Sequence, residues 1–206
     1  MNDLYLMRHG ETEWNKEKRY QGQLDSPLTE TGRNRTLKQK EKISSQSFDT
    51  VYCSPLGRSR STLELLNPRT KNIQYDNALK EVSLGILQGK THDELSPDEC
   101  RAQYNFWNNP GQFELQGAES MQELEKRVSS FLNTINREKG QVLVITHTVI
   151  IKMILKILES RPMEKLWDDP FLHPATILVI DRAGGGRIKE VIYPEEGMVR
   201  PSSYSA

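Results

Sequence analysis

The chain has 206 residues, of which 28 are basic and 28 acidic, so its formal net charge is zero. With 35% hydrophobic residues, this length is enough for one globular domain with a sizeable core. The charge balance argues against nucleic acid or an anionic membrane as a partner, so any anion site must be a local concentration of cations. The two cysteines, Cys53 and Cys100, are too few for a disulfide framework and have no close-spaced partner for a metal site, which favours a reducing compartment.

The first apolar run stops at a group of reactive residues. Residues 4–7 are typical of a short buried strand, and Arg8, His9 and Gly10 follow directly. In a regular strand Arg8 and His9 would point to opposite faces, so both can serve one site only if the strand ends there, which Gly10 permits. This combination indicates phosphoryl transfer to histidine. The alternative is a surface arginine that happens to precede a core histidine.

That apolar run is too short for the core of a signal peptide. No stretch approaches the roughly 18 apolar residues of a membrane span. We therefore expect a cytoplasmic protein.

The remaining elements are predicted from periodicity and from capping signals. In the first half of the chain we expect, in order, a loop over 15–28, an exposed helix over 33–45, a strand over 49–53, a helix over 55–66 and a strand over 72–75. In the second half we expect a loop over 79–89, helices over 91–104 and 119–137, a strand over 141–146, a helix over 148–158 and strands over 175–181 and 187–193. Ser54 and Pro55 would supply the N-cap and the first position of the second helix. The glycines at 184–186 predict a hairpin turn between the last two strands.

Strands that alternate with helices predict βαβ units, and therefore a mostly parallel sheet with helices on both faces. We expect an α/β fold: a three-layer α/β/α sandwich in which the final hairpin adds an antiparallel edge strand. Residues 1–206 are interpreted as a single domain. Residues 91–136 are its expected helical insertion over the active site, and a loose tail begins at about residue 195, which could fold over the site or stay disordered.

Three predicted junctions at strand ends carry residues suited to phosphate, and in a parallel sheet such junctions gather at one edge. The first holds Arg8 and His9. The second holds Arg58, placed in the first turn of a helix whose N-terminus also favours an anion. The third holds His147, directly after the strand over 141–146. The alternatives are a solvated helix arginine and a structural histidine.

Several motifs together resemble a known family. They are Arg-His-Gly-Glu-Thr-x-x-Asn from residue 8, Ser-Pro-Leu-x-Arg from residue 54, a glutamate before a glycine-rich loop, and a late Thr-His. In this order and spacing they resemble the histidine phosphatase superfamily, the phosphoglycerate mutase-like proteins, over nearly the whole chain. The stretches 106–110 and 167–171 further resemble the broad-specificity phosphatases of bacilli within that superfamily.

The resemblance implies a metal-independent phosphoric monoester hydrolase that needs no cofactor, because arginines supply the positive charge that magnesium supplies elsewhere. It makes His9 the nucleophile that forms a transient phosphohistidine from a small phosphomonoester. Arg8, Arg58 and a protonated His147 would surround the phosphoryl oxygens. Glu81 would protonate the leaving alkoxide, which requires that burial raise the pKa of its carboxyl against the pull of neighbouring cations.

Other positions are expected to contact the substrate. The loop residues Asn15, Gln21 and Gly22 would complete the phosphate pocket, and Thr148, directly after His147, could narrow it. The leaving-group side would be lined by four ring-bearing residues: Phe106, Trp107, Phe171 and His173. The alternative for Gln21 is that it belongs to an ordinary polar loop. The alternative for the aromatic side chains is that they only pack the insertion onto the sheet.

One departure from the family pattern bears on the reaction. Many family phosphatases have Trp-Glu-Gly where this chain has Leu87, Gln88 and Gly89, which is closer to the mutase form of the loop. The short segment between Glu81 and His147 instead favours hydrolysis. We therefore expect a phosphomonoesterase of broad specificity, with a cofactor-dependent phosphoglycerate mutase and a non-catalytic phosphate-binding module as alternatives. A monomer and a homodimer are both compatible with the sequence.

Overall fold

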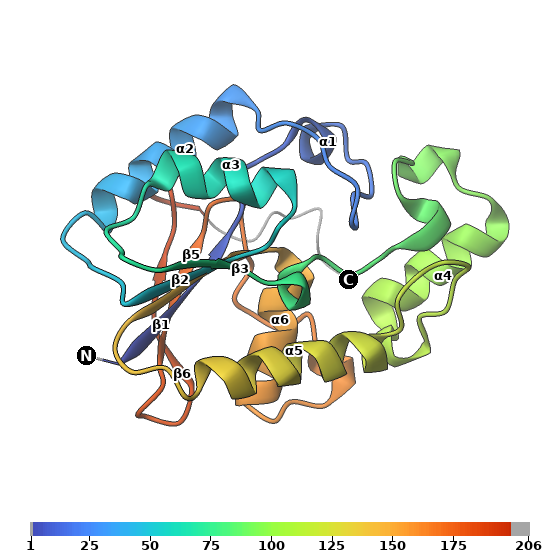
Figure 1. Cartoon of the computed structure of the whole chain (residues 1–206). Coiled ribbons are helices and arrows are strands. Elements are labelled where there is room, and N and C mark those ends of the chain that lie inside the picture. Colours follow the sequence, from blue (N-terminus) through green and yellow to red (C-terminus); the bar gives the residue numbers. More distant parts are fainter. Residues whose placement is uncertain (1, 199–206) are drawn as a thin grey trace.

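The computed structural model describes residues 2–198. One six-stranded sheet organises these residues, with the strand order β3-β2-β4-β1-β5-β6 (Figure 1). The strands are β1 (Asp3–Arg8), β2 (Thr50–Cys53), β3 (Ile73–Tyr75), β4 (Val142–Thr146), β5 (Ile177–Asp181) and β6 (Arg187–Ile192). Strands β1 to β4 pair in parallel, and β5 runs antiparallel to both of its neighbours. The prediction of a mostly parallel sheet with an antiparallel hairpin at one edge is confirmed.

Helices cover both faces of the sheet (Figure 1). Helices α2 (Glu30–Lys42) and α3 (Gly57–Leu66) lie on one face, and α5 (Met121–Ile135) and α6 (Thr148–Leu158) lie on the other. Because successive side chains of a strand point to opposite faces, β1 contributes to two separate cores. Tyr5 and Met7 pack in the core with side chains of α3, whereas Leu4 and Leu6 pack with those of α5 and α6. The expected α/β/α sandwich is therefore present.

The shorter helices lie in the segments that connect the strands and the long helices. They are α1 (Glu13–Lys16), α4 (Pro97–Asn108) and the 3-10 helices Asn77–Leu79, Gly85–Leu87, His92–Glu94, Pro110–Gln112 and Met163–Lys165. Helix α4 begins later than the predicted helix over 91–104. Ser96 caps it by accepting the Glu99 N–H, and Pro97 occupies its first position, so the sequence carried a start signal that periodicity alone missed.

Helix α3 also begins later than predicted, at Gly57. Its N-cap is Leu56, which has no side-chain cap, so the expected cap at Ser54 with Pro55 in the first turn is wrong. An acidic residue far away in the sequence takes over this role: Asp25 accepts the Gly57 N–H at 2.7 Å. The start of this helix therefore depends on a tertiary contact.

The region expected to be an insertion, 91–136, has two parts with different positions. Helix α4 lies beyond the sheet at one side of the molecule, whereas α5 runs along a sheet face beside α6 (Figure 1). Phe131 of α5 packs edge-on against Tyr52 of β2, with ring centroids 5.3 Å apart. The expectation is therefore corrected: α5 is a structural layer of the sandwich, and only the segment around α4 extends from it.

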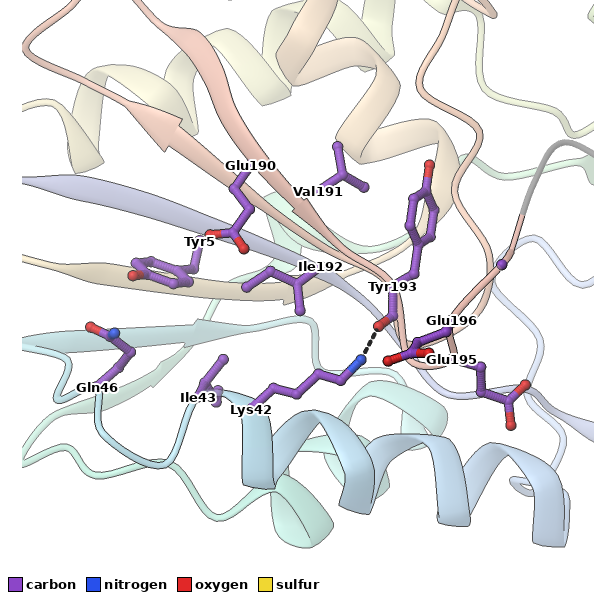
Figure 2. A pocket seen from close by; sticks show the side chains of 11 residues that line it. Tyr5, Lys42, Ile43, Gln46, Glu190, Val191, Ile192, Tyr193, Glu195 and Glu196 are labelled. Atoms are coloured by element: carbon purple, nitrogen blue, oxygen red, sulfur yellow. Dashed lines mark hydrogen bonds between the residues drawn. The ribbon is translucent and has the colours of Figure 1, made fainter.

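The chain near residue 195 is held against α2. Glu195 pairs with Arg35 at 2.8 Å and with Lys38 at 3.0 Å, which corrects the expectation that the chain is loose from this residue on. The rest of the expected tail, residues 199–206, lies outside the described residues. Close by, a shallow groove of about 490 Å³ runs between α2 and β6, where Figure 2 shows Lys42 reaching the carbonyl oxygen of Tyr193 at 2.6 Å.

Candidate active site

The three predicted junctions meet at one edge of the sheet. His9 follows β1 and is fixed on both sides, since its N–H donates to the Thr146 carbonyl at 3.0 Å and its carbonyl accepts the Ala175 N–H at 3.0 Å. His147 follows the neighbouring strand β4, and the two imidazole centroids are 5.2 Å apart. Arg58 reaches them from α3, with its Nε 3.3 Å from His9 Nε2. Residues from β1, β4 and α3 thus form one cluster.

The hydrogen bonds of His9 determine its tautomer. Its Nδ1 lies 2.7 Å from the Gly10 carbonyl oxygen, which can only accept a proton. Its Nε2 faces Arg58 Nε, which can only donate, so Nδ1 carries the hydrogen and Nε2 holds the lone pair. Burial lowers the pKa of His9 well below its usual range, and the charges of Arg58 and Arg8 lower it further. His9 is therefore a neutral imidazole, the form that a nucleophile requires.

Arg58 is held rigidly by the loop over 21–25. Its side chain is buried and donates to the carbonyl oxygens of Gly22 and Leu24, both at 2.7 Å, and to Asp25 Oδ1 at 2.8 Å. Burial lowers the pKa of Arg58, an effect that Asp25 opposes, but a guanidinium stays charged in proteins. The result is a fixed cation beside His9.

Arg8 is the second cation of the cluster. Its Nη1 donates to the Leu172 carbonyl at 2.6 Å, and its backbone N–H donates to the Thr176 carbonyl at 3.0 Å. The charge of Arg8 lowers the pKa of both His9 and His147. The loop that precedes β5 therefore orients this arginine.

His147 is completely buried, and its Nε2 lies 2.8 Å from Ser54 Oγ. Burial lowers the pKa of His147 well below its usual range, and Arg58, His9 and Arg8 lower it further, in that order. Burial and these charges favour the neutral imidazole. The protonated His147 was expected beside a phosphoryl dianion and stays a prediction.

Glu81 faces the cluster from the loop after β3. Its carboxylate accepts the N–H groups of Val82 at 3.0 Å and Val149 at 3.3 Å. Burial raises the pKa of this carboxyl above its ordinary value, and the charge of Arg58 is the strongest of the opposing effects. The predicted direction and cause of the pKa shift are confirmed.

The loop residues expected in the phosphate pocket are mainly engaged in holding the loop. Asn15 forms a capping box with Thr12 at the start of α1. Gln21 is buried and donates to Thr12 Oγ1 at 2.7 Å, while its Oε1 is buried with no hydrogen-bond partner among residues 2–198. The carbonyl of Gly22 accepts from Arg58 as described, and Thr148 opens α6 directly after His147. Gln21 Oε1 is an acceptor, so it could meet a donor group of a ligand but not a phosphoryl oxygen.

The aromatic residues expected on the leaving-group side divide into two pairs. Phe106 is 5% exposed and packs against Phe113 and Trp167, and Trp107 packs against Trp167 with ring centroids 4.6 Å apart. Phe106 therefore packs α4 against its neighbours, which is the alternative that the sequence left open. Trp107 is 38% exposed, and its contact with a leaving group stays a prediction.

The other pair lies close to the catalytic cluster. The rings of Phe171 and His173 are 4.8 Å apart and flank Leu172, whose carbonyl binds Arg8. This pair remains a candidate for leaving-group contact.

Sequence reasoning missed four supporting residues: Asp25, which grips Arg58, Ser54, which contacts His147, and Gln23 and Arg127, which donate to the Glu81 carbonyl at 3.1 Å and 3.2 Å. Ser54 stands in the Ser-Pro-Leu-x-Arg motif, but its contact with His147, like the other three contacts, joins segments that are far apart in the chain and has no local signal. Among residues 2–198, no group of three His, Cys, Asp or Glu side chains could hold a metal ion. Within the same residues, every helix is too short or too polar to cross a membrane.

Comparison with known proteins gives consistent results. The profile of the histidine phosphatase superfamily (branch 1) matches residues 4–193. A Salmonella choleraesuis protein named "Probable phosphoglycerate mutase GpmB" is 33% identical over 165 residues, which cover 79% of this chain and 77% of that protein. The structure of YhfR from Bacillus stearothermophilus superposes with a TM-score of 0.84 at 32% identity, covering 97% of this chain and 98% of that one. A candidate alpha-ribazole-5'-P phosphatase from Escherichia coli K-12 gives a TM-score of 0.82 at 25% identity, covering 96% and 100%.

Proposed function

This chain belongs to the histidine phosphatase superfamily, branch 1, and on that premise we propose that it hydrolyses small phosphomonoesters through a phosphohistidine at His9. One observation carries the proposal: the environments of His9 and Glu81 shift their pKa values in opposite directions. The imidazole stays neutral, and the carboxyl keeps its proton to a higher pH than an exposed carboxyl does. Two groups whose pKa values are shifted apart in this way can serve as the nucleophile and the general acid of one site.

In the proposed reaction, His9 Nε2 attacks phosphorus opposite the leaving oxygen, and the P–O bond breaks as the P–N bond forms. Glu81 gives its proton to the leaving alkoxide. The same carboxylate then takes a proton from water, whose oxygen displaces His9 from phosphorus and releases inorganic phosphate. Arg8 and Arg58 would balance the phosphoryl charge in both steps.

The surroundings of Glu81 favour an alcohol leaving group without a second anionic group. Three cations belong to the 81–90 segment or hydrogen-bond to it, and each is paired with a carboxylate: Arg127 with Glu119, Arg19 with Glu17 and Glu94, and Lys90 with Glu99. Paired cations attract a further carboxylate weakly. This supports hydrolysis of varied phosphomonoesters over the phosphoglycerate mutase reaction.

A phosphoglycerate mutase is the second candidate, because the relative from Salmonella carries that name and the loop reads Leu87, Gln88, Gly89. Gln88 Oε1 accepts the Gln23 N–H at 2.7 Å, so this residue braces the loop beside Arg58. Bracing of this kind is compatible with either reaction. We also propose a cytoplasmic location, which suits the two unpaired thiols of Cys53 and Cys100.

The two reactions are separated by incubating the protein with an aryl phosphate, an alkyl phosphate and 3-phosphoglycerate. We expect inorganic phosphate from all three, with the lowest rate for 3-phosphoglycerate because it carries a second anionic group, and no 2-phosphoglycerate. Isomerisation without phosphate release would establish the mutase, and inertness toward all three would indicate a binding module. A His9→Ala variant should lose phosphate release, whereas the matched His92→Ala change at an exposed histidine should keep it.

A further inference from the structure

Ser54 contacts His147 in a buried polar pair that the mechanism above does not use. Neither residue is exposed to solvent, and Ser54 Oγ lies 2.8 Å from His147 Nε2. Ser54 Oγ also accepts the Leu56 N–H at 3.4 Å, which leaves the hydroxyl hydrogen available for the imidazole. A second hydroxyl, Ser59 Oγ, is 3.4 Å from the same Nε2. Two hydroxyl groups therefore converge on one ring nitrogen.

The other ring nitrogen, His147 Nδ1, is buried and has no hydrogen-bond partner among residues 2–198. Buried polar atoms are nearly always hydrogen-bonded, so an exception calls for an explanation. The ring that carries this atom is 5.2 Å from that of His9, where the phosphoryl group would be transferred. A ligand in that place would complete the hydrogen bonding of Nδ1.

The charge of that ligand decides which form of His147 fits. A phosphoryl dianion offers only acceptors, so a lone pair on Nδ1 would repel it and an N–H would bind it. A hydroxyl that donates to Nε2 selects the tautomer with the hydrogen on Nδ1. His147 can then bind the anion while neutral, which agrees with the lowering of its pKa by burial and by Arg58, His9, Arg8 and Arg127.

We propose that Ser54 is a positioning residue that holds His147 as the Nδ1–H tautomer, so that a neutral imidazole donates to the phosphoryl group. The inference rests on the proposed function for the identity of that anion. His9 adopts the same tautomer, but its Gly10 contact covers Nδ1 and leaves Nε2 as the reacting atom. The two histidines thus present opposite nitrogens, one as nucleophile and one as donor.

Nitrogen-15 NMR of the imidazole side chains of the wild-type protein tests the tautomer directly. We expect a pyrrole-like Nδ1 and a pyridine-like Nε2 for His147, assigned by comparison with a His147→Gln variant. A proton on Nε2, or on both nitrogens, would overturn the proposal. Because this readout needs no turnover, a protein that shows the expected tautomer but releases no phosphate would refute the proposed function and leave this inference standing.

Binding of inorganic phosphate, measured by calorimetry, tests the role of the hydroxyl. Loss of one hydrogen bond in Ser54→Ala should weaken phosphate binding about fivefold to tenfold. Ser54→Thr, which keeps a hydroxyl, should stay within about twofold of the wild type, and Ser59→Ala serves as the matched control with the smaller effect. Wild-type affinity in Ser54→Ala would contradict the proposal, and so would equal losses in Ser54→Ala and Ser54→Thr. Should the buried substitutions prevent folding, the wild-type NMR spectrum still decides.

Discussion

His9 and His147 have the same side chain but different partners, and the partners decide what each can do. The Gly10 carbonyl contacts Nδ1 of His9, while the Ser54 hydroxyl contacts Nε2 of His147. Burial beside Arg58 keeps both rings neutral by lowering their pKa values. The pKa of Glu81, in the same cluster, is raised instead, because burial penalises the charged form of a carboxyl. Residue type alone therefore does not define the chemistry at this sheet edge.

The raised pKa of Glu81 leads to a pH dependence with a definite sign. The general acid must be protonated, so kcat/KM for an alkyl phosphate should fall as pH rises through the raised pKa. The same shift means that the folded state binds this proton more tightly than the unfolded chain, in which the carboxyl titrates near 4.5. The contribution of Glu81 to the free energy of unfolding should therefore decrease as the pH rises from 4.5 through the higher pKa of the folded state.

A Glu81→Gln substitution should lower kcat/KM for the alkyl phosphate by about 10²–10⁴-fold and abolish the falling limb of its pH profile. The loss should be smaller for p-nitrophenyl phosphate, whose leaving group needs no proton. Glu114→Gln, at an exposed position, is the matched control. An unchanged rate in Glu81→Gln would remove Glu81 from this role.

At the scale of elements, the start of α3 links a helix to the catalytic cation. Leu56 cannot cap this helix, and Asp25 does so from 32 residues away while also pairing with the Arg58 guanidinium. Asp25→Ala should therefore lower the free energy of unfolding by about 1 kcal/mol, as loss of an N-cap does. It should also raise KM for phosphomonoesters more than it lowers kcat, because Arg58 loses a fixed partner.

Chemical denaturation and steady-state kinetics of the same variant check both effects. Asp98→Ala removes an aspartate that is 85% exposed and should change neither quantity. A destabilised Asp25→Ala protein with wild-type KM would show that Asp25 caps the helix without orienting Arg58.

Helix α4 offers a second test at this scale, because its aromatic residues were candidates for substrate contact. Phe106 is buried against Phe113 and Trp167. Phe106→Ala should lower the free energy of unfolding by about 3–5 kcal/mol, with Phe106→Leu giving a smaller loss. KM for a bulky aryl phosphate should stay near the wild-type value in Phe106→Leu. A large increase in KM with unchanged stability would return Phe106 to the substrate site.

For the whole molecule, the sheet was predictable because its signals are local. Short apolar runs ended by Arg8, Ser54 and His147 place the strand ends, and the alternation of strands and helices requires them to meet at one edge. The pKa shift of Glu81 was also predictable, since a carboxyl acid must be buried to work near neutral pH.

Other features depend on contacts across the fold and have no local pattern. The start of α3 depends on Asp25, and the position of α5 depends on packing against β2. The pKa of His147 is lowered first by burial and then by the charges of arginines in α3, β1 and α5, so this shift could not be predicted from the sequence around the residue. Aromatic residues in α4 could equally have faced a substrate or a core, and only tertiary packing decides between them.

If the phosphoryl group passes through His9, a phosphohistidine can be trapped on that residue. Wild-type and Glu81→Gln proteins would be mixed with p-nitrophenyl phosphate, quenched in alkali, digested and analysed by mass spectrometry. We expect a phosphoryl group on the peptide that contains His9. It should accumulate more in Glu81→Gln, where water is no longer deprotonated, and be absent from His9→Ala. Release of inorganic phosphate with no phosphoryl group on His9 in either protein would contradict this mechanism.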